Sequence, residues 1–284
     1  MVVIYVPLAV FEYKAHRNIY IGPYFSINKV YGSAGVDADL LIMGNSRADE
    51  HYDDALIGDT LGLRCYNIGC HGNPIEFQYH VMLKAYLNRN TKPKYVLLDI
   101  SPFSMFKYLS SRRSFEFLPY LSRPEFSYYI NSCRVFKPCD RLLLPRYAGV
   151  MYQVFKGLQS FNTVPAPKSE AYQPIIMNEP VPLEQEAENI AAFYDFIGYC
   201  IDNGMKLILV CSPMHEDHYC KYVDMDAFWK QVDEAVDGRN VTVLDYATLY
   251  GSDTRYFHDL LHLNKFGRTQ FSKTIAHDLK AKIK

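Results

Sequence analysis

The 284-residue sequence is 49% apolar and 15% aromatic, and its formal net charge is -1 at pH 7. This length and composition allow one large core, or a core with an insertion, and exclude an intrinsically disordered chain. Because the charges balance, no whole-molecule field attracts nucleic acid, and we expect none as a partner.

The N-terminus opens with an apolar run, residues 2–11 (VVIYVPLAVF). This run is too short to cross a bilayer, which takes about 20 residues. It also lacks the basic start and the cleavage site of a signal peptide. Three alternatives remain open: a buried strand or helix, the trailing end of a membrane anchor, or an interfacial segment. We treat residues 1–38 as an N-terminal segment and residues 39–284 as the main domain.

Five short apolar runs, each ending in a loop, predict buried β-strands. Helical patterns alternate with these runs along the chain. This alternation is typical of an α/β fold with a parallel sheet and helices on both faces. The predicted strands are residues 39–43, 65–68, 95–100, 206–211 and 241–244.

Three helices have clear sequence signals. Apolar residues recur at three- and four-residue steps over residues 183–201, and Gly204 follows as a C-terminal stop. Asn73 is a candidate N-cap for a second helix. Asn264 is a candidate N-cap for a third. The buried face of this last helix is expected to comprise Phe271, Ile275 and Leu279.

Residues 101–180 separate the third and fourth strands and are far longer than a normal connection, so we expect an insertion there. This segment holds ten Lys or Arg residues against five acids, a net charge of +5. Because the whole chain is at -1, the remainder is at -6. A helical cap with an exposed basic face is favoured over a specific anion site.

The seven cysteines form no C-x-x-C pair, and Cys65, Cys200 and Cys211 lie in apolar segments. We therefore expect buried thiols and no disulfide framework. The odd number leaves at least one free thiol, which favours a reducing compartment such as the cytoplasm.

Ser46 lies where the first strand gives way to a helix, within Gly44-Asn45-Ser46-Arg47. In open α/β sheets, ligands bind at the carboxyl ends of the strands. A serine at this point can attack a carbonyl group if a base removes its proton. The alternative is that Ser46 only caps the helix, because Ser46-x-x-Asp49 also fits a capping box.

Asp259 and His262 lie between the last strand and the last helix. A histidine that acts as a base needs a carboxylate on its other ring nitrogen. An aspartate three residues earlier in a turn can supply that carboxylate within one loop, although both residues also fit an ordinary surface turn. With Ser46, the pair predicts a serine hydrolase-type site, in which Ser46 is the nucleophile, His262 the base and Asp259 the orienting acid.

Together these segments resemble the SGNH hydrolase superfamily, also called GDSL-like hydrolases. Gly44-Asn45-Ser46 is similar to the nucleophile block, with Asn for the usual Asp, and Asp259-x-x-His262-Leu263 matches the last block. Asn67-Ile68-Gly69 resembles the second block. The resemblance implies a flavodoxin-like three-layer α/β/α sandwich with a five-stranded, mostly parallel sheet and a helical insertion. It also implies that the amides of Ser46 and Gly69 form the oxyanion hole.

One block departs from the family pattern. The family usually has Gly-x-Asn-Asp after the third strand, and its asparagine donates to the oxyanion, whereas residues 98–103 read LDISPF. Asn73 is a candidate replacement, although its role as an N-cap is favoured. Losing one oxyanion donor can cost about 3 kcal/mol of transition-state stabilisation.

A strand followed by Gly-x-Ser-Arg, together with a strand ending Asp-x-Ser-Pro-Phe, resembles a branch of the superfamily. This branch includes membrane-anchored, extracytoplasmic proteins of bacterial polysaccharide or teichoic acid modification. This likeness implies an extracytoplasmic or membrane-anchored location, with membrane association through the N-terminus. The cytoplasm is the alternative.

Residues that follow the strand ends are candidates for lining the substrate. For Arg47, a salt bridge with Asp49 or Asp53 is the default alternative. The candidate lining residues are Arg47, Asp99, Ser101, Ser212 and His215.

Four potential metal ligands, Cys211, His215, His218 and Cys220, share one loop, but their spacing matches no common zinc site. We therefore expect no metal, and acyl transfer through a serine needs no cofactor.

We expect a serine esterase or O-acyltransferase that forms an acyl-enzyme with a small-molecule or carbohydrate ester. The alternative is a non-catalytic glycan-binding or assembly protein that retains the fold. The altered third block favours the second function, whereas the retained Ser, Asp and His favour the first.

Overall fold

The computed structural model describes residues 6, 8–10, 27–106, 114–132, 136–148, 172, 186–221 and 225–283. At its centre lies a five-stranded sheet in the order β2-β1-β3-β4-β5, with every neighbouring pair parallel. This strand order is the flavodoxin-like one, so the predicted α/β class is confirmed. The strands are β1 (Leu40–Met43), β2 (Cys65–Asn67), β3 (Tyr95–Asp99), β4 (Lys206–Cys211) and β5 (Thr242–Asp245).

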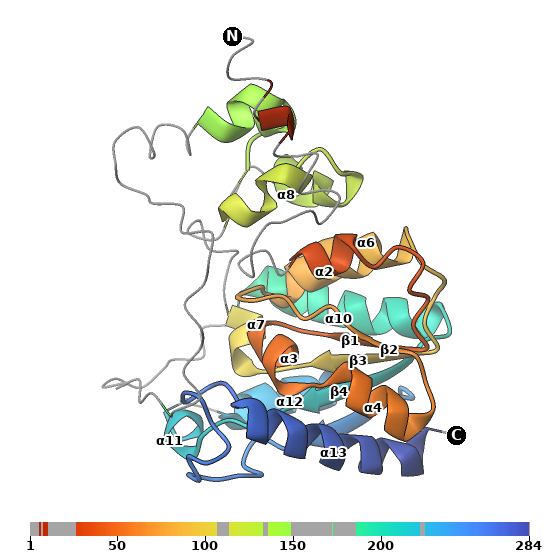
Figure 1. The fold of residues 1–284 in the computed structure, drawn as a ribbon, viewed down its shortest axis with the longest axis vertical. Helices are drawn as coiled ribbons and strands as arrows, with labels where there is room; N and C mark the ends of the chain where they lie inside the picture. Colours follow the sequence, from red (N-terminus) through yellow and green to blue (C-terminus); the bar gives the residue numbers. More distant parts are fainter. Residues whose placement is uncertain are drawn as a thin grey trace.

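The sheet is covered on both faces by helices (Figure 1). In β1, Leu40 and Ile42 point into one core, whereas Leu41 and Met43 point into the other. A strand buried on both faces reads as an unbroken apolar run, which explains why the strands were recognisable in the sequence.

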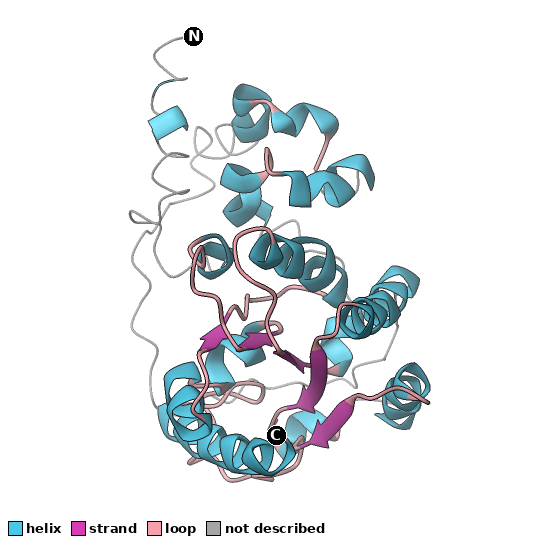
Figure 2. Cartoon of the chain, turned by 90° about the vertical axis from the view of Figure 1, so that its right-hand side faces the viewer, coloured by secondary structure: helices cyan, strands magenta, loops and turns pink. Residues whose placement is uncertain are grey.

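The smaller core lies beneath α3 (Ser46–His51), α4 (Asp54–Leu61) and α13 (Lys265–Lys282). The larger core includes side chains from the opposite layer and from short helices that follow β3. Figure 2 shows helices on both sides of the sheet. The opposite layer comprises α2 (Ile27–Tyr31), α5 (Ile75–Phe77), η1 (Gln78–Leu83), α6 (Lys84–Leu87), α10 (Ala187–Asp202) and α12 (Met225–Val236).

Two of the three predicted helices have the expected ends. Helix α10 runs to Asp202, and Gly204 follows with a φ of +69°. Helix α13 begins after Asn264, whose side-chain oxygen accepts the Gly267 amide hydrogen at 2.9 Å. The third helix differs at its start, because Pro74 occupies the N-cap of α5 and the Asn73 side chain makes no cap bond.

Between β3 and α10, the described residues form short helices. Two of their aromatic rings, Phe117 and Phe126, lie 4.6 Å and 5.9 Å from the ring of Phe77 and join the larger core. Within the predicted insertion at residues 101–180, residues 107–113, 133–135, 149–171 and 173–180 lie outside the described residues. The helices are α7 (Pro102–Phe106), η2 (Ser114–Tyr120), η3 (Pro124–Phe126), α8 (Ser127–Ser132) and η4 (Pro138–Arg141).

The N-terminal segment, residues 1–38, is described from residue 27 onward and at residues 6 and 8–10. Ile27 and Val30 of α2 are fully buried in the larger core, so this part of the segment packs with the main domain. Most of the apolar run 2–11 lies outside the described residues. Within the described parts of the chain, no helix has the length and hydropathy needed to cross a membrane.

The packing of α13 against the sheet predicts a large loss of stability for Phe271→Ala. Phe271 is fully buried, with its ring 5.3 Å from that of Tyr52 and 5.4 Å from that of Tyr246. Removing it leaves a cavity, and we expect the free energy of unfolding to fall by about 3–5 kcal/mol.

The matched control on the same helix is Phe266→Ala, because Phe266 is 51% exposed. Urea denaturation of both variants measures the difference. Similar losses for the two would contradict the assignment of Phe271 to the core.

Candidate active site

Ser46 begins α3 directly after β1, and the cap of this helix is the residue before it. The Asn45 side-chain oxygen accepts the Arg47 amide hydrogen at 3.0 Å. The alternative that Ser46 is the N-cap is therefore wrong, because Asn45 performs that role. The Ser46 hydroxyl is left available for another partner.

Gly44 allows α3 to start close against the sheet. Its φ is +149°, and a Cβ atom there would lie 2.7 Å from the Ala48 Cβ and 2.9 Å from the Asp99 Cβ. A side chain at this position would push α3 away from β3. Gly44 thus fixes the distance between the helix that carries Ser46 and the sheet.

The structure brings Ser46, His262 and Asp259 together at the carboxyl edge of the sheet. His262 Nε2 lies 2.8 Å from Ser46 Oγ, and His262 Nδ1 lies 2.9 Å from Asp259 Oδ2. With the proton on Nδ1 donated to the carboxylate, Nε2 accepts the Ser46 hydroxyl hydrogen. The side chains of His262 and Asp259 are 18% and 14% exposed, so solvent reaches this cluster.

The Asp259 carboxylate is held in place by backbone amides of the turn to which it belongs. Its Oδ1 accepts the amide hydrogens of Leu261 and His262, both at 2.8 Å. Burial raises the pKa of Asp259, but the hydrogen bonds and charge of His262, with these two amides, outweigh it and lower the pKa to about 2. The carboxylate is therefore ionised at neutral pH and can accept a hydrogen bond from His262 Nδ1.

The Gly69 amide, expected as an oxyanion donor, is already bonded. It donates to the Asn67 side-chain oxygen at 2.8 Å, while Asn67 Nδ2 donates to the Ala48 carbonyl at 2.7 Å. Asn67 therefore ties the loop after β2 to α3. Gly69 itself lies so close to α3 that a Cβ atom would be 2.4 Å from the Asp49 amide nitrogen.

Asn73, the candidate third donor, is 1% exposed. Its Nδ2 donates to the Cys70 carbonyl at 3.1 Å, and its own carbonyl accepts from Gln78 Nε2 at 3.0 Å. In this structure Asn73 thus closes the loop between β2 and α5.

Arg47, a candidate substrate-lining residue, is buried in this structure. It is 3% exposed, its Nε lies 3.9 Å from Asp99 Oδ1, and its Nη2 donates to both the carbonyl and the hydroxyl of Ser212. The expected partner Asp49 instead pairs with His71, at 2.6 Å. Arg47 therefore joins α3 to the ends of β3 and β4.

The other candidate lining residues are buried as well, so none of the five side chains is exposed in this structure, and their substrate-lining role stays a prediction. Asp99 and Ser212 are fully buried, Ser101 is 1% exposed and His215 is 3% exposed. His215 packs between the rings of Tyr172 and Phe257 instead. Strand ends predict proximity to the site, but they do not predict which way a side chain points.

His51 is a site residue that the sequence reasoning missed. Its Nδ1 lies 2.8 Å from Ser212 Oγ, and its Nε2 accepts the Leu263 amide hydrogen at 3.1 Å. Burial, aided by the Arg47 charge, holds the pKa of His51 well below its usual range. The sequence does contain one indication of this position. Arg47 and His51 are four residues apart, so on a helix they lie on the same face.

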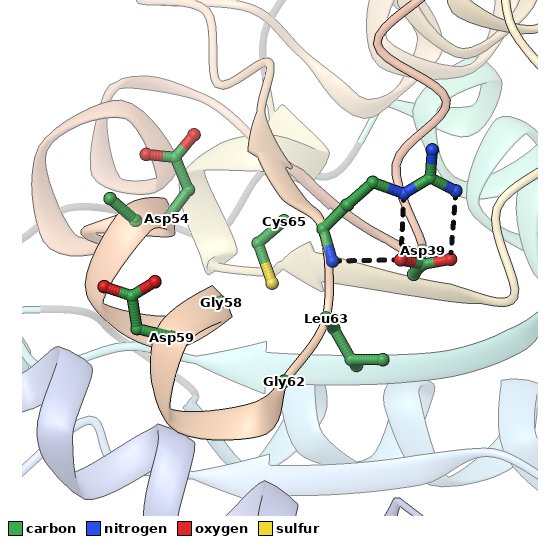
Figure 3. A pocket seen from close by; sticks show the side chains of 9 residues that line it. Asp39, Asp54, Gly58, Asp59, Gly62, Leu63 and Cys65 are labelled. Carbon is green, nitrogen blue, oxygen red and sulfur yellow. Dashed lines mark hydrogen bonds and ion pairs between the residues drawn. The ribbon is translucent and has the colours of Figure 1, made fainter.

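A shallow hollow of about 540 Å³ lies at the opposite edge of the sheet (Figure 3). Its lining includes Asp39 and Cys65, at the amino ends of β1 and β2, and Asp59 of α4. The Arg64 guanidinium group closes one side by pairing with Asp39. This hollow is separate from Ser46, which lies at the carboxyl end of β1.

In the described part of the chain, no three His, Cys, Asp or Glu side chains gather closely enough to hold a metal ion. Of the four potential ligands in the loop after β4, Cys211, His215 and His218 are buried and Cys220 is exposed. Burial raises the pKa of the Cys211 thiol to about 12, which disfavours the thiolate that metals bind. None of the six described cysteines forms a disulfide within the described part of the chain.

Comparison with known protein families finds none that matches this chain. No curated protein matches its sequence either. Among solved structures, the chain is similar to a proposed acylhydrolase from Bacteroides fragilis NCTC 9343, with 9% identity, a TM-score of 0.42 and 86% of each chain covered.

The tight contact at Gly69 predicts that Gly69→Ala is destabilising. The added methyl group would overlap the backbone of Ala48 and Asp49, so the loop or α3 must move. We expect a loss of about 1–3 kcal/mol in the free energy of unfolding. The control is Gly198→Ala in α10, where a Cβ atom meets nothing within 4 Å, and little change or a small gain is expected. Equal effects in chemical denaturation would contradict the close approach at Gly69.

The lowered pKa of Asp259 predicts a pH-dependent contribution to stability. Its folded pKa of about 2 lies below the ordinary 3.8, so the stabilisation is complete above pH 3.8 and fades as the pH falls toward 2. The stability gap between the wild type and Asp259→Asn should therefore shrink between pH 5.5 and pH 3. Urea denaturation across this range measures the gap. A gap independent of pH would argue against the paired carboxylate.

Proposed function

We propose that this protein is a serine esterase or O-acyltransferase that works through an acyl-enzyme. The observation that carries this proposal is the continuous chain of hydrogen bonds from Asp259 through His262 to Ser46, with 2.9 Å and 2.8 Å between the bonded atoms. A hydroxyl group bonded to an imidazole, which in turn is bonded to a carboxylate, is the arrangement that activates a serine nucleophile.

In the proposed reaction, Ser46 Oγ attacks the ester carbonyl while its proton moves to His262 Nε2. The imidazolium ion that forms is stabilised by the ionised Asp259. When the tetrahedral intermediate collapses, the ester C–O bond breaks and His262 returns the proton to the leaving alkoxide. Water or a second hydroxyl group then attacks the acyl-Ser46 ester, with His262 again taking the proton. When this second intermediate collapses, the bond between the acyl carbon and Ser46 Oγ breaks and His262 returns the proton to Ser46 Oγ.

The oxyanion needs donors, and the Ser46 amide at the start of α3 is the first candidate. The Gly69 amide can join it only if its hydrogen leaves the Asn67 side-chain oxygen, which it contacts at 2.8 Å. Each missing donor costs about 3 kcal/mol, so the proposed enzyme is slow unless substrate binding shifts this loop.

The proposed substrate is an O-acylated carbohydrate or a smaller ester. Support comes from the resemblance of the sequence blocks to polysaccharide-modifying proteins and from the +5 charge of residues 101–180. The same resemblance supports an extracytoplasmic or membrane-anchored location. The identity of the acyl acceptor, water or a sugar hydroxyl, separates an esterase from a transferase, and product analysis with and without added glycan distinguishes them.

The rival function is a non-catalytic glycan-binding or assembly protein. The bonded Gly69 amide favours it, because a binding protein needs no oxyanion hole. The Ser46–His262–Asp259 chain opposes it, because a largely buried hydroxyl–imidazole–carboxylate chain gives no advantage to a surface that only binds.

Reaction with a fluorophosphonate probe tests the proposal. The wild type should be labelled at Ser46 and Ser46→Ala should not be labelled, because only an activated serine displaces the fluoride. His262→Ala should be labelled at least about 100-fold more slowly. Mass spectrometry of the labelled peptide measures both outcomes.

The matched control is Ser252→Ala, an exposed serine outside the site, which should be labelled like the wild type. Absence of labelling in wild-type protein with a normal circular dichroism spectrum would refute the proposed catalysis and leave the binding function.

A further inference from the structure

The loop that carries His262 is held by a second histidine, His51. The Leu263 amide, one residue after His262, donates its hydrogen to His51 Nε2 at 3.1 Å. The two imidazole rings meet edge to face with centroids 6.4 Å apart. Helix α3 begins at Ser46 and ends at His51. One short helix therefore carries the proposed nucleophile and also binds the loop that contains His262, the proposed base.

Both ring nitrogens of His51 have fixed roles. Because Nε2 accepts the Leu263 hydrogen, it must hold a lone pair, and the proton of the neutral ring lies on Nδ1. Nδ1 donates to Ser212 Oγ at 2.8 Å, and Ser212 Oγ also accepts from Arg47 Nη2 at 3.0 Å. The ring is fully buried, so it cannot exchange these partners for water.

A second contact joins the end of α3 to the helix that follows His262. Ser272 of α13 donates its hydroxyl hydrogen to the His51 carbonyl at 3.5 Å and accepts the Asp53 amide hydrogen at 2.8 Å. The chain on the C-terminal side of His262 is therefore attached to the same turn at two points, Leu263 and Ser272.

We infer that His51 is a positioning residue, which keeps His262 Nε2 within reach of Ser46 Oγ by anchoring Leu263 to the helix that begins at Ser46. This inference rests on the proposed function. A shift of about 1 Å in a reacting group can cost about 100-fold in rate. Cutting the anchor should therefore slow the reaction without changing how the probe binds.

Two substitutions test the two hydrogen bonds of His51 separately, because each can retain only one of them. In His51→Gln, the side-chain oxygen takes the place of Nε2 and can still accept the Leu263 hydrogen. In His51→Asn, the side-chain NH₂ takes the place of Nδ1 and retains only the bond to Ser212. Fluorophosphonate labelling of the two variants and the wild type gives a maximal rate and a half-saturating probe concentration for each. Thermal unfolding gives their stability.

We expect His51→Asn to lose about 10- to 100-fold in maximal labelling rate with an unchanged half-saturating concentration. His51→Gln should remain within a few-fold of the wild type. Equal maximal labelling rates for His51→Asn and His51→Gln would overturn the inference. In that case, labelling of the wild type would still support the proposed function. If His51→Asn does not fold, His51→Gln decides alone, since a loss as large as that of His262→Ala would overturn the role of the Leu263 anchor. A folded wild type that is not labelled refutes the proposed function and this inference together.

Discussion

Arg47 and Asp99 form a buried ion pair at the carboxyl edge of the sheet, and the arrangement around Ser46 depends on it. The side chain of Arg47 is 3% exposed and that of Asp99 is fully buried. Burial raises the pKa of Asp99, whereas the Arg47 charge and hydrogen bonds from Ser212 and Tyr52 oppose that rise. Removing one partner of such a pair typically costs about 3–5 kcal/mol, because the other charge is left in a low-dielectric interior.

This pair connects segments that are distant in the sequence. Arg47 and Tyr52 come from α3 and the residue after it, Asp99 from the end of β3 and Ser212 from the residue after β4. Tyr52 donates its hydroxyl hydrogen to Asp99 at 2.6 Å. Helix α3 has only six residues and could not hold a fixed position through its own backbone bonds. Its position is set by these buried contacts and by the close approach at Gly44.

The fold was largely predictable because its signals are local. Strands β1, β3 and β4 are largely buried apolar runs, whereas β2 and β5 are only partly buried. Helices α10 and α13 have the expected periodicity, and each has the expected cap or stop residue. The ion-pair and hydrogen-bond partners of individual side chains were predicted less well. The sequence favours Asp49 or Asp53 as the partner of Arg47, whereas Arg47 pairs with Asp99. It favours Asn73 as the N-cap of the helix that follows, whereas Pro74 occupies that position. The Arg47 error comes from choosing a nearby partner where the fold supplies a distant one, whereas the Asn73 error concerns which of two adjacent residues is the N-cap of α5.

The sequence by itself determined the α/β class, the order of strands and helices, and the residue types available for chemistry at the strand ends. These features depend on hydrophobic periodicity and on turn and capping residues within a few positions of each other. Only the tertiary structure decided that His262 lies within reach of Ser46, that His51 accepts the Leu263 amide hydrogen, and that Arg47 pairs with Asp99. The direction of a side chain and the occupancy of a donor depend on contacts between segments as far apart as Ser46 and His262, which no local pattern records.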